Sequence, residues 1–314
     1  MPVRDDWASA AELTRRLDNT ISPHPYSLEV VMVDDGSLQS FTPRDFDRTM
    51  SAVRRIRVIR LRRNVGHQRA IAIGLVYVEQ NIPCDGLMVM DADGEDTAEG
   101  ALQLLHKFSE TGASLAIFAE RIRRSESLVF RTSYFLYRTV HLMLTGLKVR
   151  VGNFSVLPAK NLTTLVVLSE LWNHYAAAVF HSRLPYALVP IPRGYRIAGT
   201  SKMNFVALVT HGLSAISVFG DVVGVRTLIA SLMCGILVLI GLAVTVWIRF
   251  ATDLSIPGWA TYAFGTLLII FFQLITISSS FTFFMLSNRT SLGFVPLRDT
   301  PLFIAEVVDA YPRA

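Results

Sequence analysis

Two aspartates with one residue between them stand directly after an apolar run. Asp91 and Asp93 follow residues 86–90, GLMVM, a run that predicts a buried strand. Side chains at this spacing can converge across the turn that ends such a strand, and two carboxylates suit Mg²⁺ or Mn²⁺ beside a diphosphate. An ion held there would neutralise the charge of a departing diphosphate. The alternative interpretation of the pair is a solvated turn.

Polar side chains also follow the other predicted strands. Asp34 and Asp35 come after residues 28–33, LEVVMV, and Asn64 follows residues 57–61, RVIRL. A carboxylate at a strand end can accept hydrogen bonds from a base or a ribose. A turn with a helix cap is the alternative interpretation.

The order of the expected elements indicates a fold class. Strands are expected at 28–33, 57–61, 86–90 and 114–119, and helices at 7–19, 68–79 and 96–109, the last opened by a capping-box pattern. Residues 1–3 resemble the last turn of a further strand. Apolar strands that alternate with helices indicate a mostly parallel α/β sheet. Such sheets bind ligands outside the carboxyl ends of their strands, which is where the polar residues named above fall.

Arginines are concentrated in two groups. The first comprises Arg54, Arg55, Arg57, Arg60, Arg62 and Arg63, and the second comprises Arg121, Arg123, Arg124, Arg131 and Arg138. We interpret most of the first group as a solvated face. The second leads into an expected aromatic-rich helix at 126–145, and because guanidinium groups bind phosphate in a bidentate fork, a lipid phosphate is the expected anion. His67 has no His or Cys at metal spacing, so the sequence predicts no zinc site.

The C-terminal third of the chain carries long uncharged stretches. No charged residue lies between Arg226 and Arg249, or between Asp253 and Arg289. A bilayer core needs about 20 apolar residues in a helix, so we expect two membrane spans at 227–248 and 260–286. We divide the chain into a catalytic domain at 1–202, an interfacial helix at 203–225, the two-helix hairpin at 226–288 and a C-terminal tail at 289–314.

The flanking charges predict the orientation of the hairpin. Lys202, Arg226, Arg289 and Arg298 lie outside the pair of spans, and only Arg249 and Asp253 lie between them. The positive-inside rule therefore places the catalytic domain and both termini in the cytoplasm, on the cytoplasmic membrane.

Composition excludes several classes of protein. The 314 residues are 51% hydrophobic, with a mean hydropathy of +0.41, which argues against disorder, collagen and a disulfide scaffold. The two cysteines, Cys84 and Cys234, fit a reducing compartment. The N-terminal residues have no apolar core typical of a signal peptide. A net charge of +5 favours anionic lipid or a phosphorylated substrate, since no nucleic-acid motif is recognisable.

Six segments, in order, resemble one family. The matching segments are Pro2-Val3-Arg4-Asp5-Asp6 (P-V-Y-N-E in the family), Val33-Asp34-Asp35-Gly36-Ser37 (V-D-D-G-S), Arg63-Asn64-Val65-Gly66-His67-Gln68 with Ala70 and Gly74 (R-N-x-G-x-x-x-A…G-L), Asp91-Ala92-Asp93-Gly94-Glu95-Asp96 (D-A-D-L-Q-D), Gly152-Asn153-Phe154-Ser155 (G-D-F-R) and Arg196 to Lys202 (R-x-x-G-x-S-K). Followed by two spans, they resemble family 2 glycosyltransferases, in particular the polyprenyl-phosphate glycosyltransferases related to dolichol-phosphate mannose synthase and the bacterial GtrB-type enzymes.

The resemblance implies a GT-A fold, a Rossmann-like, mostly parallel sheet flanked by helices. It also implies site residues. The donor-binding set is Pro2, Val3, Asp6, Asp34, Asp35, Asn64, Asp91, Ala92, Asp93, Arg196, Ser201 and Lys202, with Asp35 on the base. The acceptor-phosphate set is Arg121, Arg124, Arg131 and Ser133. The metal set, for Mg²⁺ or Mn²⁺, is Asp91, Asp93 and Glu95, and the catalytic set is Asp91, Asp93, Arg121, Arg131 and Lys202.

The implied reaction is an inverting transfer of a sugar from a nucleotide-sugar donor to polyprenyl phosphate, for cell-envelope glycans. An anionic membrane lipid is an expected partner, and a homo-oligomer is compatible with the resemblance. Two alternatives stay open. A catalytically inactive scaffold is favoured by Arg4 and Asn153, which depart from the family pattern. A processive polysaccharide synthase is disfavoured by the two spans and by the absence of a Q-x-x-R-W motif.

Overall fold

The computed structural model describes residues 1–39, 41–42, 46, 49–122, 139–146, 151–198, 205–252, 258–290 and 293–312. The chain folds as two compact units. The first unit contains residues 1–134, 149–218 and 294–314, and the second contains residues 135–148 and 219–293.

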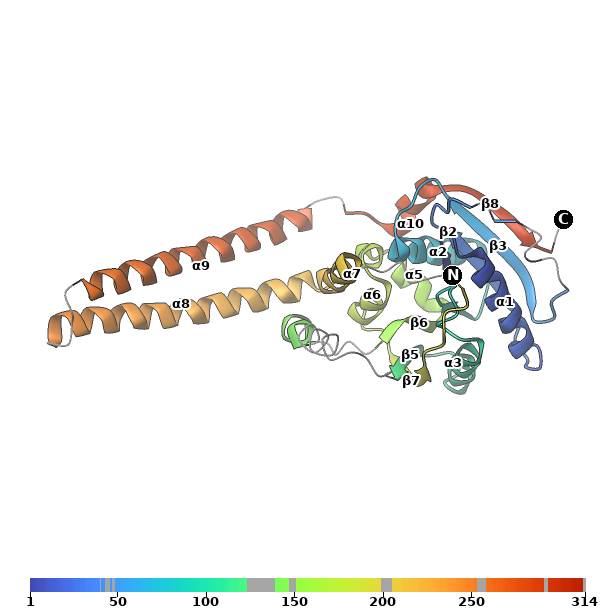
Figure 1. The fold of residues 1–314 in the computed structure, drawn as a ribbon, viewed down its shortest axis with the longest axis horizontal. Coiled ribbons are helices and arrows are strands. Elements are labelled where there is room, and N and C mark those ends of the chain that lie inside the picture. Colours follow the sequence, from blue (N-terminus) through green and yellow to red (C-terminus); the bar gives the residue numbers. More distant parts are fainter. Residues whose placement is uncertain are drawn as a thin grey trace. The chain divides into compact units, whose positions relative to one another are not determined.

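The first unit is built from short strands and amphipathic helices (Figure 1). Its strands are β1 (Pro2–Val3), β2 (Leu28–Asp34), β3 (Val53–Leu61), β4 (Gly86–Val89), β5 (Ala116–Ile122), β6 (Val151–Pro158), β7 (Tyr186–Pro192) and β8 (Ile304–Tyr311). Its helices are α1 (Trp7–Ile21), α2 (His67–Asn81), α3 (Ala98–Glu110), α5 (Leu162–Leu165), α6 (Tyr175–His181), α7 (Phe205–Ser217) and α10 (Pro296–Asp299), with 3-10 turns η2 (Ala159–Asn161), η3 (Ser169–Trp172) and η4 (Thr300–Phe303).

The strands form two sheets rather than one. The first has the order β1-β2-β3-β8 and the second the order β4-β6-β5-β7. β1, β2 and β3 are parallel to one another, and β5 is parallel to β7. β8 is antiparallel to β3, and β6 is antiparallel to both β4 and β5. The predicted α/β class is therefore confirmed. Instead of one mostly parallel sheet there are two sheets, in which the parallel pairs are β1–β2, β2–β3 and β5–β7.

Helices cover both faces of the two sheets. Along β5, Ala116 and Phe118 pack with α2 and α6, whereas Ile117 and Ala119 pack with α1 and α3. In the first sheet α1 packs with Val30 and Met32 in one cluster, and α2 packs with residues of β2 and β3 in another. The alternation of side chains along a strand explains this division.

Most of the expected elements lie close to their predicted positions. α3 begins at Ala98, two residues later than expected, because Thr97 caps it by accepting a hydrogen bond from the Gly100 N–H (3.0 Å). β3 begins at Val53 instead of at 57, and β5 is shifted from 114–119 to Ala116–Ile122. β6 and β7 had not been predicted.

The segment after residue 293 lies in the region predicted as a C-terminal tail at 289–314. The chain returns to the first unit, where Trp172 stacks on Phe294 with ring centroids 4.0 Å apart. β8 then lies alongside β3 at the edge of the first sheet (Figure 1). β8 resembles a tail in sequence because most of its side chains are exposed or half-exposed.

Opposite charges face each other across the β3–β8 pair. Arg60 is paired in register with Glu306 and forms an ion pair with it. Arg57 is paired with Asp309, with 3.5 Å between Nε and Oδ1. Part of the arginine group interpreted as a solvated face therefore helps to hold β8 in register.

We predict that Glu306→Lys lowers the free energy of unfolding by about 0.5–1 kcal/mol, because it places like charges directly opposite each other. Arg60→Glu combined with Glu306→Lys should restore most of this loss. Thermal unfolding of the full-length protein in detergent would measure both effects, and a double variant no more stable than the single one would contradict the pairing.

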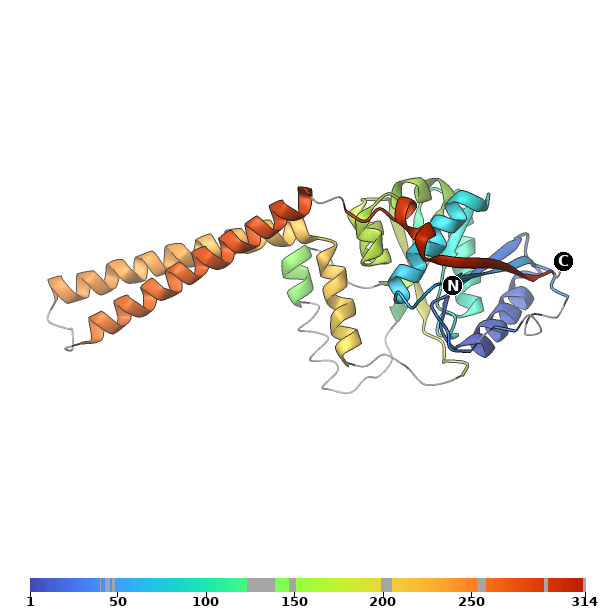
Figure 2. The ribbon, with the colours of Figure 1, turned by 90° about the horizontal axis from the view of Figure 1, so that it is seen from above.

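The second unit contains two long apolar helices. α8 (Gly220–Ala251) and α9 (Trp259–Thr290) run side by side in both views (Figures 1 and 2). Both are long and apolar enough to cross a membrane. The expected spans lie within them. The predicted interfacial helix at 203–225 is interrupted, however, since α7 ends at Ser217 and α8 begins at Gly220.

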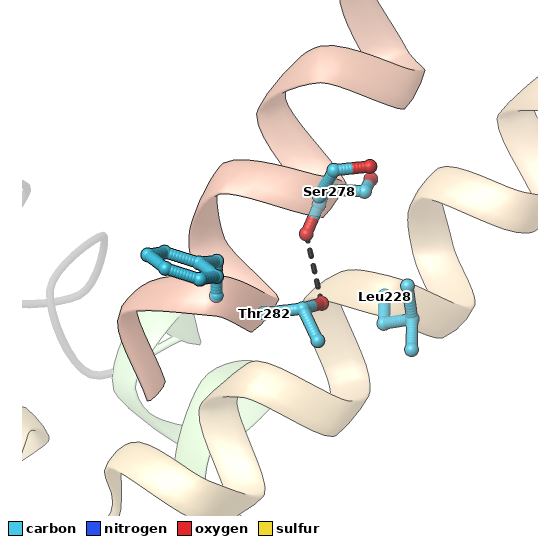
Figure 3. Close-up of a pocket in the computed structure, with 5 residues that line it drawn as sticks. Leu228, Ser278 and Thr282 are labelled. Atoms are coloured by element: carbon cyan, nitrogen blue, oxygen red, sulfur yellow. Dashed lines mark hydrogen bonds between the residues drawn. The ribbon is translucent and has the colours of Figure 1, made fainter. Parts of the chain in front are cut away.

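A shallow groove of about 420 Å³ lies between the two helices (Figure 3). It is lined by Leu228, Ser278, Ser279, Thr282 and Phe283. The Thr282 hydroxyl donates to the carbonyl of Ser278 (2.8 Å), so this polar group is satisfied within its own helix.

The described part of the aromatic-rich helix predicted at 126–145 is helical from residue 139, and its earlier residues lie outside the described part of the chain.

Candidate active site

The strand ends bring the predicted site residues to one edge. The carboxyl ends of β1, β2 and β3 lie together because these strands are parallel. β4 and β5 are both antiparallel to β6, so their carboxyl ends also share an edge, with β7 beside β5. Side-chain contacts described below connect the two edges.

Asp35 organises the loop between β3 and α2. Its carboxylate accepts hydrogen bonds from the backbone N–H groups of Val65 (2.6 Å) and Gly66 (3.0 Å), and from the Asn64 amide (2.9 Å). Gly66, at a φ of 96°, adopts a conformation that favours glycine and is the last residue before α2. Asp35 is almost fully buried, and burial raises its pKa above the usual value for an aspartate.

Asp34 holds the neighbouring turn. Its carboxylate accepts from the Ser37 N–H (2.9 Å). Gly36, at a φ of 68°, lies so close to this loop that an added Cβ would be 2.8 Å from the Asn64 nitrogen. The structure therefore brings Asp35 and Asn64 into contact as the strand-end argument predicted, and gives both aspartates a role in shaping loops. Contact of Asp35 with a base stays a prediction.

Asp35→Asn should lower the free energy of unfolding by about 1–3 kcal/mol, because an amide N–H₂ would face buried N–H donors and leave them unsatisfied. Denaturant titration of the full-length protein would measure the loss. Asp85→Asn, a change at an exposed acid, is the control. Equal stability of the two variants would show that the buried hydrogen bonds of Asp35 contribute little.

Three of the four acids in the turn after β4 each face a different basic side chain. Asp91 Oδ1 lies 3.2 Å from Nε2 of His67. Asp93 Oδ2 accepts from Arg196 (3.1 Å), and Glu95 Oε2 accepts from Nε of Arg193 (2.8 Å). The acids are close enough to affect one another, since burial raises the pKa of Asp93 and the negative charges of Asp91 and Glu95 raise it further.

Arg196 joins the two sheet edges. Its guanidinium donates to Asp93 and also to Asp6 at the start of α1 (2.8 Å), while its Nε donates to the carbonyl of Ala198 (2.9 Å). Asp93 is 103 positions and Asp6 is 190 positions away from Arg196 in sequence. The structure thus brings together three residues of the predicted donor-binding set.

The segment 193–198 lies directly on the acidic turn. The Gly194 N–H donates to the carbonyl of Glu95 (2.8 Å), and the Ile197 N–H donates to the carbonyl of Asp93 (2.9 Å). A Cβ on Gly94 would be 2.5 Å from the Ile197 side chain, so the approach requires a glycine there. The turn is also braced from within, because Asp96 accepts from the Asp91 N–H (2.8 Å).

A series of buried hydrogen bonds between amide groups leads to His67. The Tyr175 N–H donates to Oε1 of Gln68 (2.8 Å), and Nε2 of Gln68 donates to Oδ1 of Asn153 (3.2 Å). Nδ2 of Asn153 lies 3.1 Å from Nε2 of His67. The residues that contact His67, Asp91 and Asn153, are remote from it in sequence, so no local pattern predicts these contacts.

The acids of this turn are chemically suited to a divalent cation. Asp91 and Asp93 offer hard carboxylate oxygens in a region where negative charges already repel one another. Among the described residues, no three His, Cys, Asp or Glu side chains converge closely enough to hold an ion by themselves. Glu95, the third predicted ligand, is engaged by Arg193. Asp93 is engaged by Arg196 in the same way, so an ion at either acid would have to displace a guanidinium.

Other predicted residues can be located only in part. Pro2 and Val3 pair with Val33 and Asp34 at the sheet edge, and Ala92 is buried in the turn. Arg121 is the sixth residue of β5, opposite Ile191 of β7, and its side chain is outside the described part of the structure. The remaining predicted residues, Arg124, Arg131, Ser133, Ser201 and Lys202, also lie outside it.

The chain is similar to known glycosyltransferases. The sequence profile of the family described as Glycosyl transferase family 2 matches residues 1–160. The uncharacterized glycosyltransferase YkcC of Bacillus subtilis (strain 168) is 24% identical over 275 residues, which cover 83% of this chain and 80% of that protein. The uncharacterized glycosyltransferase sll0501 of Synechocystis is 24% identical over 283 residues, covering 88% of this chain and 86% of that protein.

The family profile spans half of the chain and contains the acidic turn, the Asp35 loop and β6. With the strand-end acids assembled as described, the chain belongs to glycosyltransferase family 2 and is a glycosyltransferase.

Proposed function

We propose that the protein transfers a sugar from a nucleotide-sugar donor to a polyprenyl phosphate, with inversion at the anomeric carbon. The observation that carries the proposal is the contact of Arg196 with Asp93 and Asp6, which assembles acids and a phosphate-binding base from three parts of the chain. The two apolar helices α8 and α9 support a lipid acceptor, because they are suited to hold the protein at a membrane.

The proposed donor site is the edge lined by the β1, β2, β3 and β4 ends. Asp91 and Asp93 would hold Mg²⁺ or Mn²⁺, which when bound stabilises the negative charge of the leaving diphosphate. Arg196 already lies at this edge, and its guanidinium can move from the carboxylates to a diphosphate oxygen. Ser201 and Lys202 follow it in sequence and would close over the same diphosphate.

The acceptor needs positioning more than it needs a base. A phosphate monoester has its second pKa near 6, so at neutral pH it is already mostly a dianion. Arg121, Arg124, Arg131 and Ser133 would hold this dianion in line with the sugar C1. One displacement then converts an α-linked donor into a β-linked lipid-phosphate sugar. The catalytic domain would lie on the cytoplasmic side, where nucleotide sugars are available.

We predict that Asp93→Asn lowers turnover by at least about a hundredfold, because it removes a charge that acts on the developing diphosphate. The thermal unfolding midpoint must be measured beside turnover, because the Asp93 side chain is only 16% exposed and pairs with Arg196. Asp85→Asn is again the matched control. Turnover that survives in Asp93→Asn would contradict the proposed role of the acidic turn.

The proposed reaction can be tested directly with purified full-length protein. The assay would contain undecaprenyl phosphate, Mn²⁺ or Mg²⁺ and a panel of radiolabelled UDP- and GDP-sugars, with extraction of the product into organic solvent. We expect label from one donor to enter the organic phase and to require both the lipid and the metal. Transfer to water alone, or to a soluble acceptor in place of the lipid, would refute the lipid-phosphate acceptor.

A further inference from the structure

Three aromatic rings from separate segments form one cluster in the first unit. Trp172 of η3 stacks on Phe294 and also lies against Phe303 of η4, with ring centroids 5.3 Å apart. The Phe294 and Phe303 centroids are 6.1 Å apart. The Arg62 N–H, just after β3, donates to the carbonyl of Phe303 (2.9 Å). The segment that leads into β8 is therefore held against the end of β3.

Two arginines lie over this aromatic cluster. The guanidinium carbon of Arg63 is 5.7 Å from the centre of the Phe303 ring, and that of Arg69 is 5.3 Å from the centre of the Trp172 ring. Both distances allow cation–π attraction, which holds a guanidinium over a ring without using its N–H donors. Both arginines are exposed. Their N–H groups are therefore available to an anion from solution or from a membrane.

Neither guanidinium is neutralised by an acid. Among the residues that the structure describes, no carboxylate forms an ion pair with Arg63 or Arg69, in contrast to the paired arginines within β3. Asp299 belongs to the segment that carries the cluster, but Arg298 engages it, with 2.7 Å between Nε and Oδ1. Glu170 of η3 accepts from the neighbouring serine hydroxyl (3.2 Å). The cluster therefore carries two uncompensated positive charges.

Arg69 lies on the side of α2 that is remote from the acidic turn. An α-helix has 3.6 residues per turn, so positions 67 and 69 are about 200° apart around the helix axis. His67 faces Asp91 of the acidic turn, and Arg69 faces Trp172. The surface that carries Arg69 is therefore separate from the proposed donor site.

This surface comes soon after a candidate membrane span in sequence. Three residues separate Phe294 from Thr290, the last residue of α9. Four residues span at most about 14 Å, so the cluster lies within a short length of chain of the point at which α9 ends. On the predicted orientation this is the cytoplasmic side. The cytoplasmic leaflet carries anionic lipids, which attract basic groups within about a Debye length of its surface.

We propose that Arg63 and Arg69 bind the headgroup phosphates of anionic phospholipids and so hold residues 63–69 at the membrane surface. A guanidinium binds phosphate as a bidentate fork, and the ring beneath each one limits its motion before the lipid arrives. The same segment contains Asn64 and Gly66, which donate to Asp35, so the lipid contact adjoins the loop that Asp35 organises. The proposal depends on α9 crossing a membrane and not on the identity of the sugar or of its acceptor.

The test measures lipid binding to the full-length protein by native mass spectrometry from a neutral detergent. Phosphatidylglycerol and phosphatidylcholine with the same acyl chains are titrated separately. We expect the unsubstituted protein to bind phosphatidylglycerol more tightly. Because each arginine near a membrane surface contributes about a fivefold gain, Arg63→Gln combined with Arg69→Gln should weaken phosphatidylglycerol binding about twentyfold. Binding of phosphatidylcholine should not change.

Arg54→Gln combined with Arg55→Gln is the matched control. It removes the same two charges from exposed positions at the other end of β3. Charges that are much further apart than about 8 Å are screened at physiological ionic strength, so this variant should bind both lipids as the unsubstituted protein does. Arg63→Lys combined with Arg69→Lys keeps both charges and should retain most of the preference. The thermal unfolding midpoints of all three double variants should lie close together, since every substituted residue is exposed.

Three results would overturn the proposal. Equal binding of the two lipids by the unsubstituted protein would show that no anionic headgroup is recognised. If the glutamine variant at positions 63 and 69 binds phosphatidylglycerol as tightly as the control variant does, the preference comes from net charge or from another surface. Displacement of phosphatidylglycerol by UDP or GDP would place the two arginines in the donor site. None of these measurements involves sugar transfer, so failure of the proposed function would be recognised separately.

Discussion

Negative charge concentrated in a half-buried turn must be compensated, and this requirement organises the edge of the fold. Asp91, Asp93 and Glu95 lie within five residues, and the partial burial of Asp93 disfavours its ionised form. Each acid is matched by a base from elsewhere: His67 from the start of α2, and Arg193 and Arg196 from the segment after β7. Because an unpaired buried charge is costly, these contacts hold together elements that no shared strand pairing connects.

The same compensation of charge allows one cation at this edge to be exchanged for another. A half-buried ion pair returns in attraction roughly what it loses in hydration, so replacing one cation by another need not change the stability of the fold greatly. An arginine that neutralises Asp93 in the absence of ligands can therefore give way to a ligand's cation. The backbone contacts of Gly194 and Ile197 hold the segment on the turn independently of the side chain of Arg196.

The sequence shows which polar residues follow the strands but not which residues they contact. Asp35, Asn64, Asp91 and Asp93 were found because strand ends are visible in a single chain as apolar runs followed by polar residues. The contacts of Arg193 with Glu95 and of Arg196 with Asp6 were not, because partners 98 and 190 positions apart leave no local pattern.

The unpredicted strands have their own physical reasons. β7 is apolar, but it contains two prolines, Pro190 and Pro192, which argue against a strand in the sequence. β8 lies at an edge with most of its side chains at least partly exposed, so it lacks the apolar run typical of a central strand. Arg57 and Arg60 were assigned to solvent because their partners on β8 lie about 250 residues later. The antiparallel placement of β6, which brings Asn153 beside the acidic turn, likewise depends on tertiary pairing.

The return of the chain to β8 has a topological consequence. β7 and β8 belong to the same compact unit. The segment between them, which contains α8 and α9, must therefore begin and end on the same side of any membrane that it crosses. The number of crossings in such a segment is necessarily even. Either both helices or neither of them can cross a bilayer. If only one crossed it, β8 would lie on the opposite side from β3 and the two strands could not pair.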